Sequence, residues 1–245
     1  MTTQLKKPLE VYTAGTPNGQ KVTIFLEELK AVYPDFKYNV NRIDLQKNEQ
    51  KEDWFLKINP NGRIPALVDP NREDHPVWET AAILLYLEKH YDPDHKFSFG
   101  DSADVDNYRS EILQWMFFVH GGVGPMQGQA NHFYRYAPEK IPYAIKRYQD
   151  ETRRLYSVLE TRLRDRDYLV GPGRGQYSIA DANAFPWVFW SPFAGIDHVD
   201  IPVGVKSWID RNLEREPTMK GLKVGSDKSS ELIEKMRKNG TLPLD

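Results

Sequence analysis

The segment TPNG, residues 16–19, joins a strand-like run to a helical pattern and contains one residue that the helix start does not explain. Thr16 suits the N-cap of a helix, Pro17 suits its first position, and Gly19 eases the turn. Asn18 is not required for this start, and its helix propensity is modest. An Asn side-chain amide at a helix N-terminus can donate a hydrogen bond to an anion. Because a ligand thiolate placed there would have a lowered pKa, Asn18 is the candidate catalytic residue.

A second candidate lies in WETAAI, residues 78–83, where Glu79 and Thr80 begin a helical pattern. Acidic and hydroxyl residues favour the first turn of any helix, because they cap free N–H groups and match the helix dipole. The same two residues also suit an α-amino acid head group. The N–H groups and the Thr80 hydroxyl would hold its carboxylate, and Glu79 would hold its ammonium. The pattern leaves both interpretations open.

The third candidate is GRIPALV, residues 62–68, in which a proline leads into a strand. Cis peptide bonds in folded proteins are almost confined to proline. A cis Ile64–Pro65 bond would turn the N–H and C=O of Ile64 out of the sheet edge, where a bound peptide could pair with them. An ordinary proline at the first position of a strand fits the pattern as well.

Composition restricts the chemistry that the chain can perform. Its 245 residues include no cysteine, which excludes disulfides, cysteine-based zinc sites and a protein thiolate nucleophile. Any thiol chemistry must therefore use the thiol of a ligand. The formal net charge is −2, and no run of Lys and Arg suggests nucleic-acid binding. Since no secretory signal or bilayer-spanning apolar stretch is visible, we expect a soluble cytoplasmic protein that binds neither nucleic acid nor membrane.

Three other sequence patterns lack residues that the corresponding functional site would need. The six histidines have no metal-binding spacing, so we expect no metal. His120-Gly-Gly is not accompanied by a G-x-S-x-G nucleophile motif. The GPGRG segment that begins at Gly171 is not followed by the Lys-Ser/Thr of a phosphate-binding loop. Both glycine clusters are therefore interpreted as helix breaks or turns.

The first part of the chain alternates strand and helix patterns. We expect residues 1–93 to form one domain, with strands at 8–14, 36–42, 66–68 and 76–78 and helices at 17–33, 51–58 and 81–87. In the second strand Phe36, Tyr38 and Val40 alternate with polar residues, which predicts a half-buried strand. A βαβ unit followed by a strand pair and a helix predicts a small mixed sheet covered by helices.

The second part of the chain has helical patterns throughout. Pro, Asp, Ser and Gly dominate residues 92–104, and we place a linker at 94–104. Residues 105–245 then form the second domain. Within it, a capping box at Ser178-Ile-Ala-Asp181 precedes an apolar run. The last predicted helix carries Val205, Trp208, Ile209 and Leu213.

Taken together, NPNGRIPAL, WETAAILLYLEKHY and the Ser-Ile-Ala-Asp box resemble the cytosolic glutathione S-transferases. TPNGQKV and WMFFVHGGVGPMQGQANHFYRYAPEKI are similar to one branch of that family, which holds nu-class bacterial enzymes and fungal enzymes similar to the yeast nitrogen-regulator prion protein. The resemblance covers residues 8 to 215. It implies an α+β thioredoxin-like N-terminal domain with a mixed four-stranded sheet, followed by an all-α C-terminal domain.

The resemblance also implies a glutathione site in the first domain. Asn18 matches the residue that faces the glutathione sulfur. The family usually has Ser at the position of Thr80, and Thr keeps both the hydroxyl and the N–H. The residues that match glutathione contacts are Gln50 and Arg63 at the glycine end, Ile64 and Pro65 at the cysteinyl part, and Glu79 and Thr80 at the γ-glutamyl head.

The helical domain would supply the wall for an acceptor substrate or for a second glutathione. The candidates are Trp115, Met116, Phe118, His120, Gln127, His132 and Phe133, of which His132 and Phe133 match a His-Phe pair of the family. Three functions are open. The first transfers the glutathione thiol to electrophilic, peroxide or disulfide substrates. The second is a disulfide reductase or peroxidase that uses two glutathiones. The third is a non-catalytic protein on the same fold, either a ligand carrier or a regulator. The expected partners include small hydrophobic ligands. A homodimer is implied by the resemblance alone.

Overall fold

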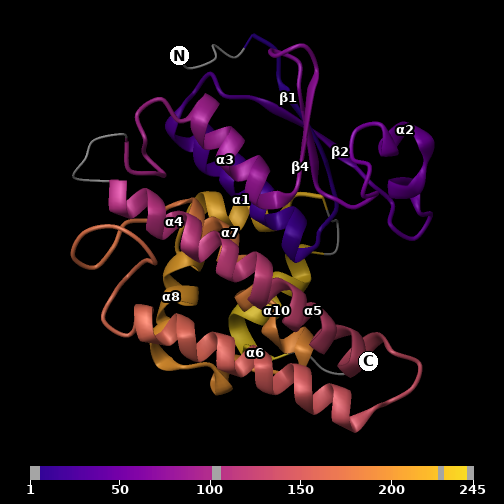
Figure 1. The fold of residues 1–245 in the computed structure, drawn as a ribbon, viewed down its shortest axis with the longest axis vertical. Helices are drawn as coiled ribbons and strands as arrows, with labels where there is room; N and C mark the ends of the chain where they lie inside the picture. Colours follow the sequence, from indigo (N-terminus) through magenta and orange to yellow (C-terminus); the bar gives the residue numbers. More distant parts are fainter. Residues whose placement is uncertain (1–5, 101–105, 226–228, 242–245) are drawn as a thin grey trace.

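A computed structural model of the chain describes residues 6–100, 106–225 and 229–241. Figure 1 shows a part that contains the sheet, in indigo and purple, next to a larger helical part. The elements of the first part are β1 (Leu9–Thr13), α1 (Pro17–Val32), β2 (Tyr38–Arg42), a 3-10 turn (Glu49–Lys51), α2 (Asp53–Leu56), β3 (Ala66–Asp69), β4 (His75–Trp78) and α3 (Thr80–Tyr91).

The described strands form one four-stranded sheet in the order β2-β1-β3-β4. Strands β1 and β2 are parallel and are joined through α1, whereas β3 runs antiparallel to β1 and β4 antiparallel to β3. Helices α1 and α3 pack together with Leu9 and Leu67 of the sheet in the main core, and Phe55 of α2 packs in a second, smaller core. The predicted mixed sheet covered by helices is confirmed.

The register of the sheet brings three distant loops together. Tyr12 of β1 and Trp78 of β4 both pair with Ala66 of β3. The segments that follow β1 and β4, and the segment that precedes β3, therefore meet at one end of the sheet. These are the three segments, at residues 16–19, 62–65 and 79–80, whose residue types suggested ligand binding.

The second part of the chain is helical, as predicted. Its elements are α4 (Asp106–Phe118), a π-helical segment (Val119–Val123), α5 (Gly124–Asn131), a second π-helical segment (His132–Tyr136), α6 (Pro142–Leu163), α7 (Ile179–Phe189), 3-10 turns (Ser191–Ala194 and His198–Asp200), α8 (Val203–Leu213), α9 (Glu216–Lys223) and α10 (Ser229–Asn239). The predicted capping box is present at the start of α7, where Asp181 accepts from the Ser178 N–H at 3.0 Å. Helices α7 and α9 both pack against α1, which joins the two parts.

Three details differ from the sequence predictions. Val40 is 43% exposed, because β2 is an edge strand that the core covers only in part. The glycines after His120 do not break the helix, since the chain continues through them as a π-helical segment, a device common at functional sites. Helices α9 and α10 follow the last predicted helix. Both are short, and Pro217 and Gly221 weaken the periodic signal of α9.

The join between the two parts lies partly outside the described residues. Helix α3 ends at Tyr91 and α4 begins at Asp106, and residues 101–105 fall in the interval that the structure does not describe. The linker at 94–104 and the domain limits therefore stay predictions. Within the described ranges, no helix is both long and apolar enough to cross a membrane. In the same ranges, no cluster of three His, Asp or Glu side chains is arranged to hold a metal ion.

Candidate functional site

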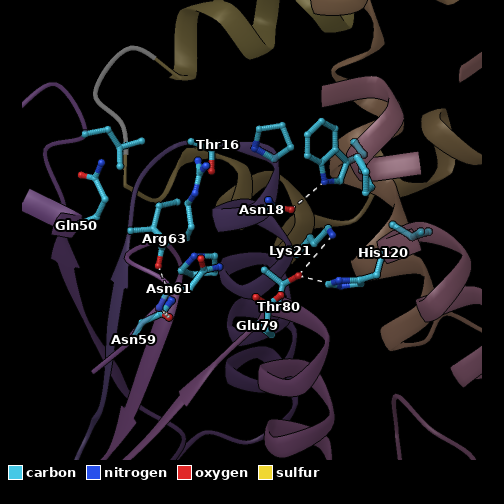
Figure 2. Close-up of a pocket in the computed structure, with 18 residues that line it drawn as sticks. Thr16, Asn18, Lys21, Gln50, Asn59, Asn61, Arg63, Glu79, Thr80 and His120 are labelled. Atoms are coloured by element: carbon cyan, nitrogen blue, oxygen red, sulfur yellow. Dashed lines mark hydrogen bonds between the residues drawn. The ribbon is translucent and has the colours of Figure 1, made fainter. Parts of the chain in front are cut away.

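A cavity of about 590 Å³ lies at the end of the sheet where the three segments meet, and residues of the helical part close it (Figure 2). The lining residues of the sheet part are Thr16, Pro17, Asn18, Lys21, Leu45, Gln50, Asn59, Asn61, Arg63, Ile64, Pro65, Glu79 and Thr80. Those of the helical part are Val119, His120, Gly124, Pro125 and Trp187. The cavity thus gathers every site residue that was predicted within residues 1–93.

The start of α1 leaves one backbone donor for a ligand. Thr16 is the N-cap, and its Oγ1 accepts from the N–H of Gly19 at 3.1 Å. Pro17 has no N–H, and the described residues offer no acceptor to the N–H of Asn18. Gly19 is required by close packing rather than by the turn, because a Cβ there would lie 2.2 Å from the carbonyl oxygen of Ala14.

The side chain of Asn18 is held in one orientation. The indole Nε1–H of Trp187 on α7 donates to the Asn18 Oδ1 at 2.9 Å (Figure 2). Because the carbonyl end of the amide is occupied, the Nδ2 end is the one available to a ligand. Asn18 therefore presents a directed N–H donor beside the positive end of the α1 dipole, which suits an anion.

Trp187 is held in place by hydrogen bonds on the side away from the cavity. Its backbone carbonyl accepts from the Nε2 of Gln127 at 2.6 Å, and the Oε1 of Gln127 accepts from the Tyr156 hydroxyl at 2.7 Å. Gly124 leaves space for the indole, since a Cβ there would lie 3.3 Å from the Trp187 Nε1. Gln127 is fully buried in this chain of bonds. It therefore supports Trp187 instead of forming the cavity wall that its sequence position suggested.

Ile64 presents a free backbone edge to the cavity. The Ile64–Pro65 peptide bond is cis, one of the two interpretations that the sequence left open. No described residue pairs with the N–H or the C=O of Ile64. An extended peptide lying in the cavity can therefore add to this edge as a short strand.

A polar, cationic end of the cavity lies next to Ile64. The Asn59 Nδ2 donates to the carbonyl of Arg63 at 2.7 Å, and its Oδ1 accepts from the Asn61 N–H at 3.0 Å, so this loop has a fixed shape. In the described chain, the Arg63 guanidinium has no ion-pair partner. The Oε1 of Gln50 is buried and has no hydrogen-bond partner among the described residues. The Arg63 guanidinium suits a ligand carboxylate, and the Gln50 Oε1 suits a ligand N–H next to that carboxylate.

The opposite end of the cavity is the N-terminus of α3. Glu79 has φ +71° and ψ 122°, a conformation that costs free energy for a residue with a side chain and that persists at functional sites. It places the Glu79 carboxylate and the first N–H groups of α3 at one point of the wall. Thr80, at the first position of the helix, is only 5% exposed. This pairing of an anion with an anion-binding helix end suits a zwitterionic amino acid head group.

The Thr80 hydroxyl is in contact with two basic side chains of the cavity wall. The Nε2 of His120 lies 3.1 Å from the Thr80 Oγ1, and the Nζ of Lys21 donates to the same oxygen at 3.5 Å. Figure 2 shows the three side chains converging from α3, the π-helical segment and α1. Lys21 is one helical turn after Asn18, which places both residues on the same face of α1.

Burial perturbs the two bases of this group. Desolvation lowers the pKa of Lys21 to about 7, against a weaker opposing effect of the Glu79 carboxylate. Desolvation, followed by the nearby Lys21 cation, lowers the pKa of His120 to about 4. His120 is therefore neutral at physiological pH, and the Lys21 amine gives up its proton far more readily than an exposed lysine does.

Several residues proposed for the helical wall lie elsewhere. Trp115 and Phe118 pack edge to face, and Met116 is core. Phe133 stacks on Tyr148 with ring centroids 5.6 Å apart. The described cavity is not lined by Trp115, His132 or Phe133. Their assignment to an acceptor or second-ligand site stays a prediction, whereas His120 does line the cavity.

Sequence reasoning missed Lys21, Trp187 and the Asn59–Asn61 pair. Lys21 carried a weak signal, because it is three residues after Asn18 and next to an apolar helical stripe. Trp187 carried none, because it lies in an apolar run typical of any buried helix. Asn59 and Asn61 belong to an ordinary turn signal.

Comparison with known proteins identifies the family. Residues 7–89 match the model of the glutathione S-transferase N-terminal domain, and residues 142–211 match that of the glutathione S-transferase C-terminal domain. The chain is 40% identical to disulfide-bond oxidoreductase YfcG of Escherichia coli (strain K12) over 228 residues, which cover 90% of this chain and 99% of the relative.

Solved structures agree with this match. A glutathione transferase homolog from Lodderomyces elongisporus, with two GSH per subunit, is 39% identical with a TM-score of 0.78, over 90% of this chain and 100% of the other. Glutathione transferase URE2P8 from Phanerochaete chrysosporium, with oxidized glutathione, is 33% identical with a TM-score of 0.79, over 94% of this chain and 98% of the other. The α+β thioredoxin-like domain with an all-helical second domain is thus confirmed, and the chain belongs to the glutathione S-transferase family.

Proposed function

We propose that this protein is a glutathione transferase that binds glutathione in the cavity, stabilises its thiolate and directs it to electrophilic, peroxide or disulfide substrates. One observation carries the proposal: Asn18, Ile64 and the Glu79–Thr80 helix start line the same cavity. Glutathione needs all three, because it has an amino acid head group, peptide groups and a thiol. Membership of the family and the glutathione bound in similar structures support this reading.

Each part of glutathione has a complementary group in the proposed pose. Glu79 pairs with the γ-glutamyl ammonium, and the first N–H groups of α3 hold the carboxylate beside it. The free backbone edge at Ile64–Pro65 pairs with the cysteinyl amide. Arg63 pairs with the glycine carboxylate, and the buried Oε1 of Gln50 accepts from the neighbouring glycine N–H. Each charged group of glutathione therefore meets a group of opposite charge or polarity in this pose.

The proposed chemical role of Asn18 is to stabilise the thiolate. Its Nδ2 and its backbone N–H would donate to the sulfur, which lowers the pKa of the thiol. The thiolate then forms a bond to an electrophilic carbon, and the leaving group departs with the bonding electrons. Since the chain has no cysteine, the ligand supplies the only thiol and the protein forms no disulfide with it.

A second candidate reaction is reduction of a disulfide or peroxide by two glutathiones. It is favoured by the relative named a disulfide-bond oxidoreductase and by the neighbour with two GSH per subunit. In this reaction the bound thiolate attacks one sulfur of the substrate, and the other sulfur leaves as a thiolate. The thiolate of the second glutathione then attacks the glutathione sulfur of the mixed disulfide, the substrate sulfur leaves as a thiolate, and glutathione disulfide is formed.

Ultraviolet difference titration of glutathione into the protein across a pH series tests the binding and the thiolate together. We expect thiolate absorbance well below the pKa of about 8.5 of a free cysteine-type thiol. Asn18→Ala should lose the thiolate signal and keep glutathione affinity. Asn39→Ala is the matched control, because Asn39 lies on the exposed strand β2. Absence of glutathione binding would contradict the proposal, and binding without thiolate would favour a carrier or regulator.

The two reactions are separated by their substrates. An aryl halide reports conjugation, and a glutathionyl mixed disulfide reports the reductase reaction. Activity on the mixed disulfide alone would assign the second candidate.

We also propose that the protein is a homodimer and is located in the cytoplasm. The exposed apolar side chains of Trp78 on β4 and of Leu113 and Phe117 on α4 support an interface, since Phe117 is 70% exposed. Light scattering on the purified protein would measure the mass in solution. Cell fractionation would test the compartment.

A further inference from the structure

Lys21 is a buried amine without an anionic partner among the described residues. Only 1% of the residue is exposed, although it lines the cavity. In the described parts of the chain, its one hydrogen bond is the long contact of 3.5 Å to the neutral Thr80 hydroxyl. Among the described residues, no carboxylate lies within ion-pair distance of its Nζ. Burying an ammonium in this way is costly unless a partner arrives or the proton leaves.

The elements that pack around Lys21 do not supply an anion that pairs with its amine. In the part of the chain that the structure describes, Glu79 is the carboxylate that raises the pKa of Lys21, and this effect is weaker than that of desolvation. His120 on the π-helical segment is neutral. Helix α7 reaches the cavity through Trp187, which does not titrate. Helix α9 meets α1 at Gln20 and Thr23, both of which are neutral.

The position of Lys21 indicates which anion would bind there. Its Nζ and the free N–H groups of α3 flank the same Thr80 side chain. A carboxylate at the N-terminus of α3 would therefore meet the helix dipole from one side and the Lys21 amine from the other. Glu79 is the complementary group for the ammonium of the same head group, so both charges of an α-amino acid are accommodated.

We propose that Lys21 is the counter-ion of the ligand's α-carboxylate, and that it takes up a proton when that carboxylate binds beside Thr80. The proposal rests on the proposed glutathione function and adds a charge-pairing residue to it. The proton comes from solvent, and the neutral amine becomes an ammonium that pairs with the carboxylate. Free glutathione loses its thiol proton when it binds as a thiolate, and Lys21 gains a proton in the same event. The two changes nearly cancel, so binding of free glutathione should release or take up almost no protons.

Calorimetry of S-methylglutathione binding in two buffers of different ionisation enthalpy tests this. The S-methyl group removes the thiol proton, and the difference in uptake between wild type and Lys21→Met gives the contribution of Lys21, because any proton gained by the ligand amine is common to both. At pH 8 we expect uptake of close to one proton per site, because an amine with a pKa of about 7 is then mostly neutral. Lys21→Met should lose this uptake and bind roughly tenfold more weakly or worse. Lys30→Met is the matched control on the same helix, since the Lys30 side chain is 55% exposed, and it should behave as wild type.

A ligand variant tests the same point in the unmodified protein. The S-methyl derivative of 4-aminobutyryl-cysteinyl-glycine lacks only the α-carboxylate, so it should bind without proton uptake and with the same affinity for wild type and Lys21→Met. Binding of S-methylglutathione without uptake, or with equal uptake by Lys21→Met, would overturn the role of Lys21 and leave the proposed function intact. Absence of S-methylglutathione binding to wild type would instead refute the proposed function.

Discussion

The indole N–H of Trp187 donates to the Asn18 side-chain oxygen at 2.9 Å, although the two residues are 169 positions apart in the chain. Asn18 belongs to the sheet part and Trp187 to the helical part. The packing of α7 against α1 therefore decides which end of the Asn18 amide faces the cavity. In this arrangement the helical part orients the donor that we propose for thiolate stabilisation, as well as closing the cavity.

Trp187→Phe should weaken thiolate stabilisation while keeping the ring in place. Phenylalanine lacks the indole N–H, so the Asn18 amide is free to rotate. We expect the pKa of bound glutathione to rise and the turnover rate to fall roughly tenfold, the effect of losing a residue that orients a contacting group. The pH dependence of thiolate absorbance measures the first effect. Trp54→Phe is the control, because Trp54 is 43% exposed and does not line the cavity. An unchanged pH profile would mean that Trp187 does not act through Asn18.

Asn18→Asp should be more harmful than Asn18→Ala. The Asp Oδ1 can still accept from Trp187, so the side chain keeps its position, but a carboxylate then faces the sulfur. Repulsion between the two anions should raise the pKa of the bound thiol above the free value of about 8.5. Thiolate absorbance over pH 6 to 10 measures this shift. Equal profiles for the Asp and Ala variants would indicate that the sulfur lies away from Asn18.

Local signals were sufficient for the sheet part and for most of its site residues. The N-cap at Thr16, the proline before β3 and the polar start of α3 are each encoded within four or five residues. The strand order then follows from a βαβ unit and a hairpin-like pair. For this reason the convergence of the three segments at one end of the sheet follows from the predicted topology.

The remainder of the site depends on packing between distant segments. A lysine on an amphipathic helix usually faces water, and Lys21 is buried only because α3 and the π-helical segment close over it. Gln127 looked like a wall residue, yet its position is set by Tyr156 and by the Trp187 carbonyl. No periodicity within a helix reports such contacts.

A buried ion pair between α1 and the residue before α9 should matter for stability but not for the site. Arg215 donates twice to Glu28, at 2.8 and 2.7 Å, and Glu28 is 2% exposed. The guanidinium also lies 3.8 Å from the ring centre of Tyr177. Arg215→Met leaves a buried carboxylate unpaired, which should cost about 3 kcal/mol of unfolding free energy.

Urea denaturation measures this cost, and a double variant identifies its origin. Arg215→Met with Glu28→Met removes both charges and should recover most of the lost stability. Lys220→Met, which breaks the exposed pair with Glu216, is the control and should leave the midpoint unchanged. A double variant as unstable as Arg215→Met would assign the loss to packing instead of charge.

The stability of the ligand-free protein should depend on pH through Lys21. Burial lowers the pKa of Lys21 to about 7 in the folded chain, against about 10.4 when unfolded. Between these values the unfolded chain binds more protons, so folding becomes more favourable as pH rises. Below pH 7 both states are protonated and the cost is constant. Relative to Lys21→Met, the unfolding free energy of wild type should increase by about 2 kcal/mol between pH 7 and 9.

Urea denaturation of both proteins at pH 6, 7, 8 and 9 measures the difference, and Lys30→Met should follow wild type. A difference in stability between wild type and Lys21→Met that does not change with pH would show that Lys21 keeps its proton without a ligand. Saturating S-methylglutathione should remove the increase of stability with pH, because the bound carboxylate keeps Lys21 protonated.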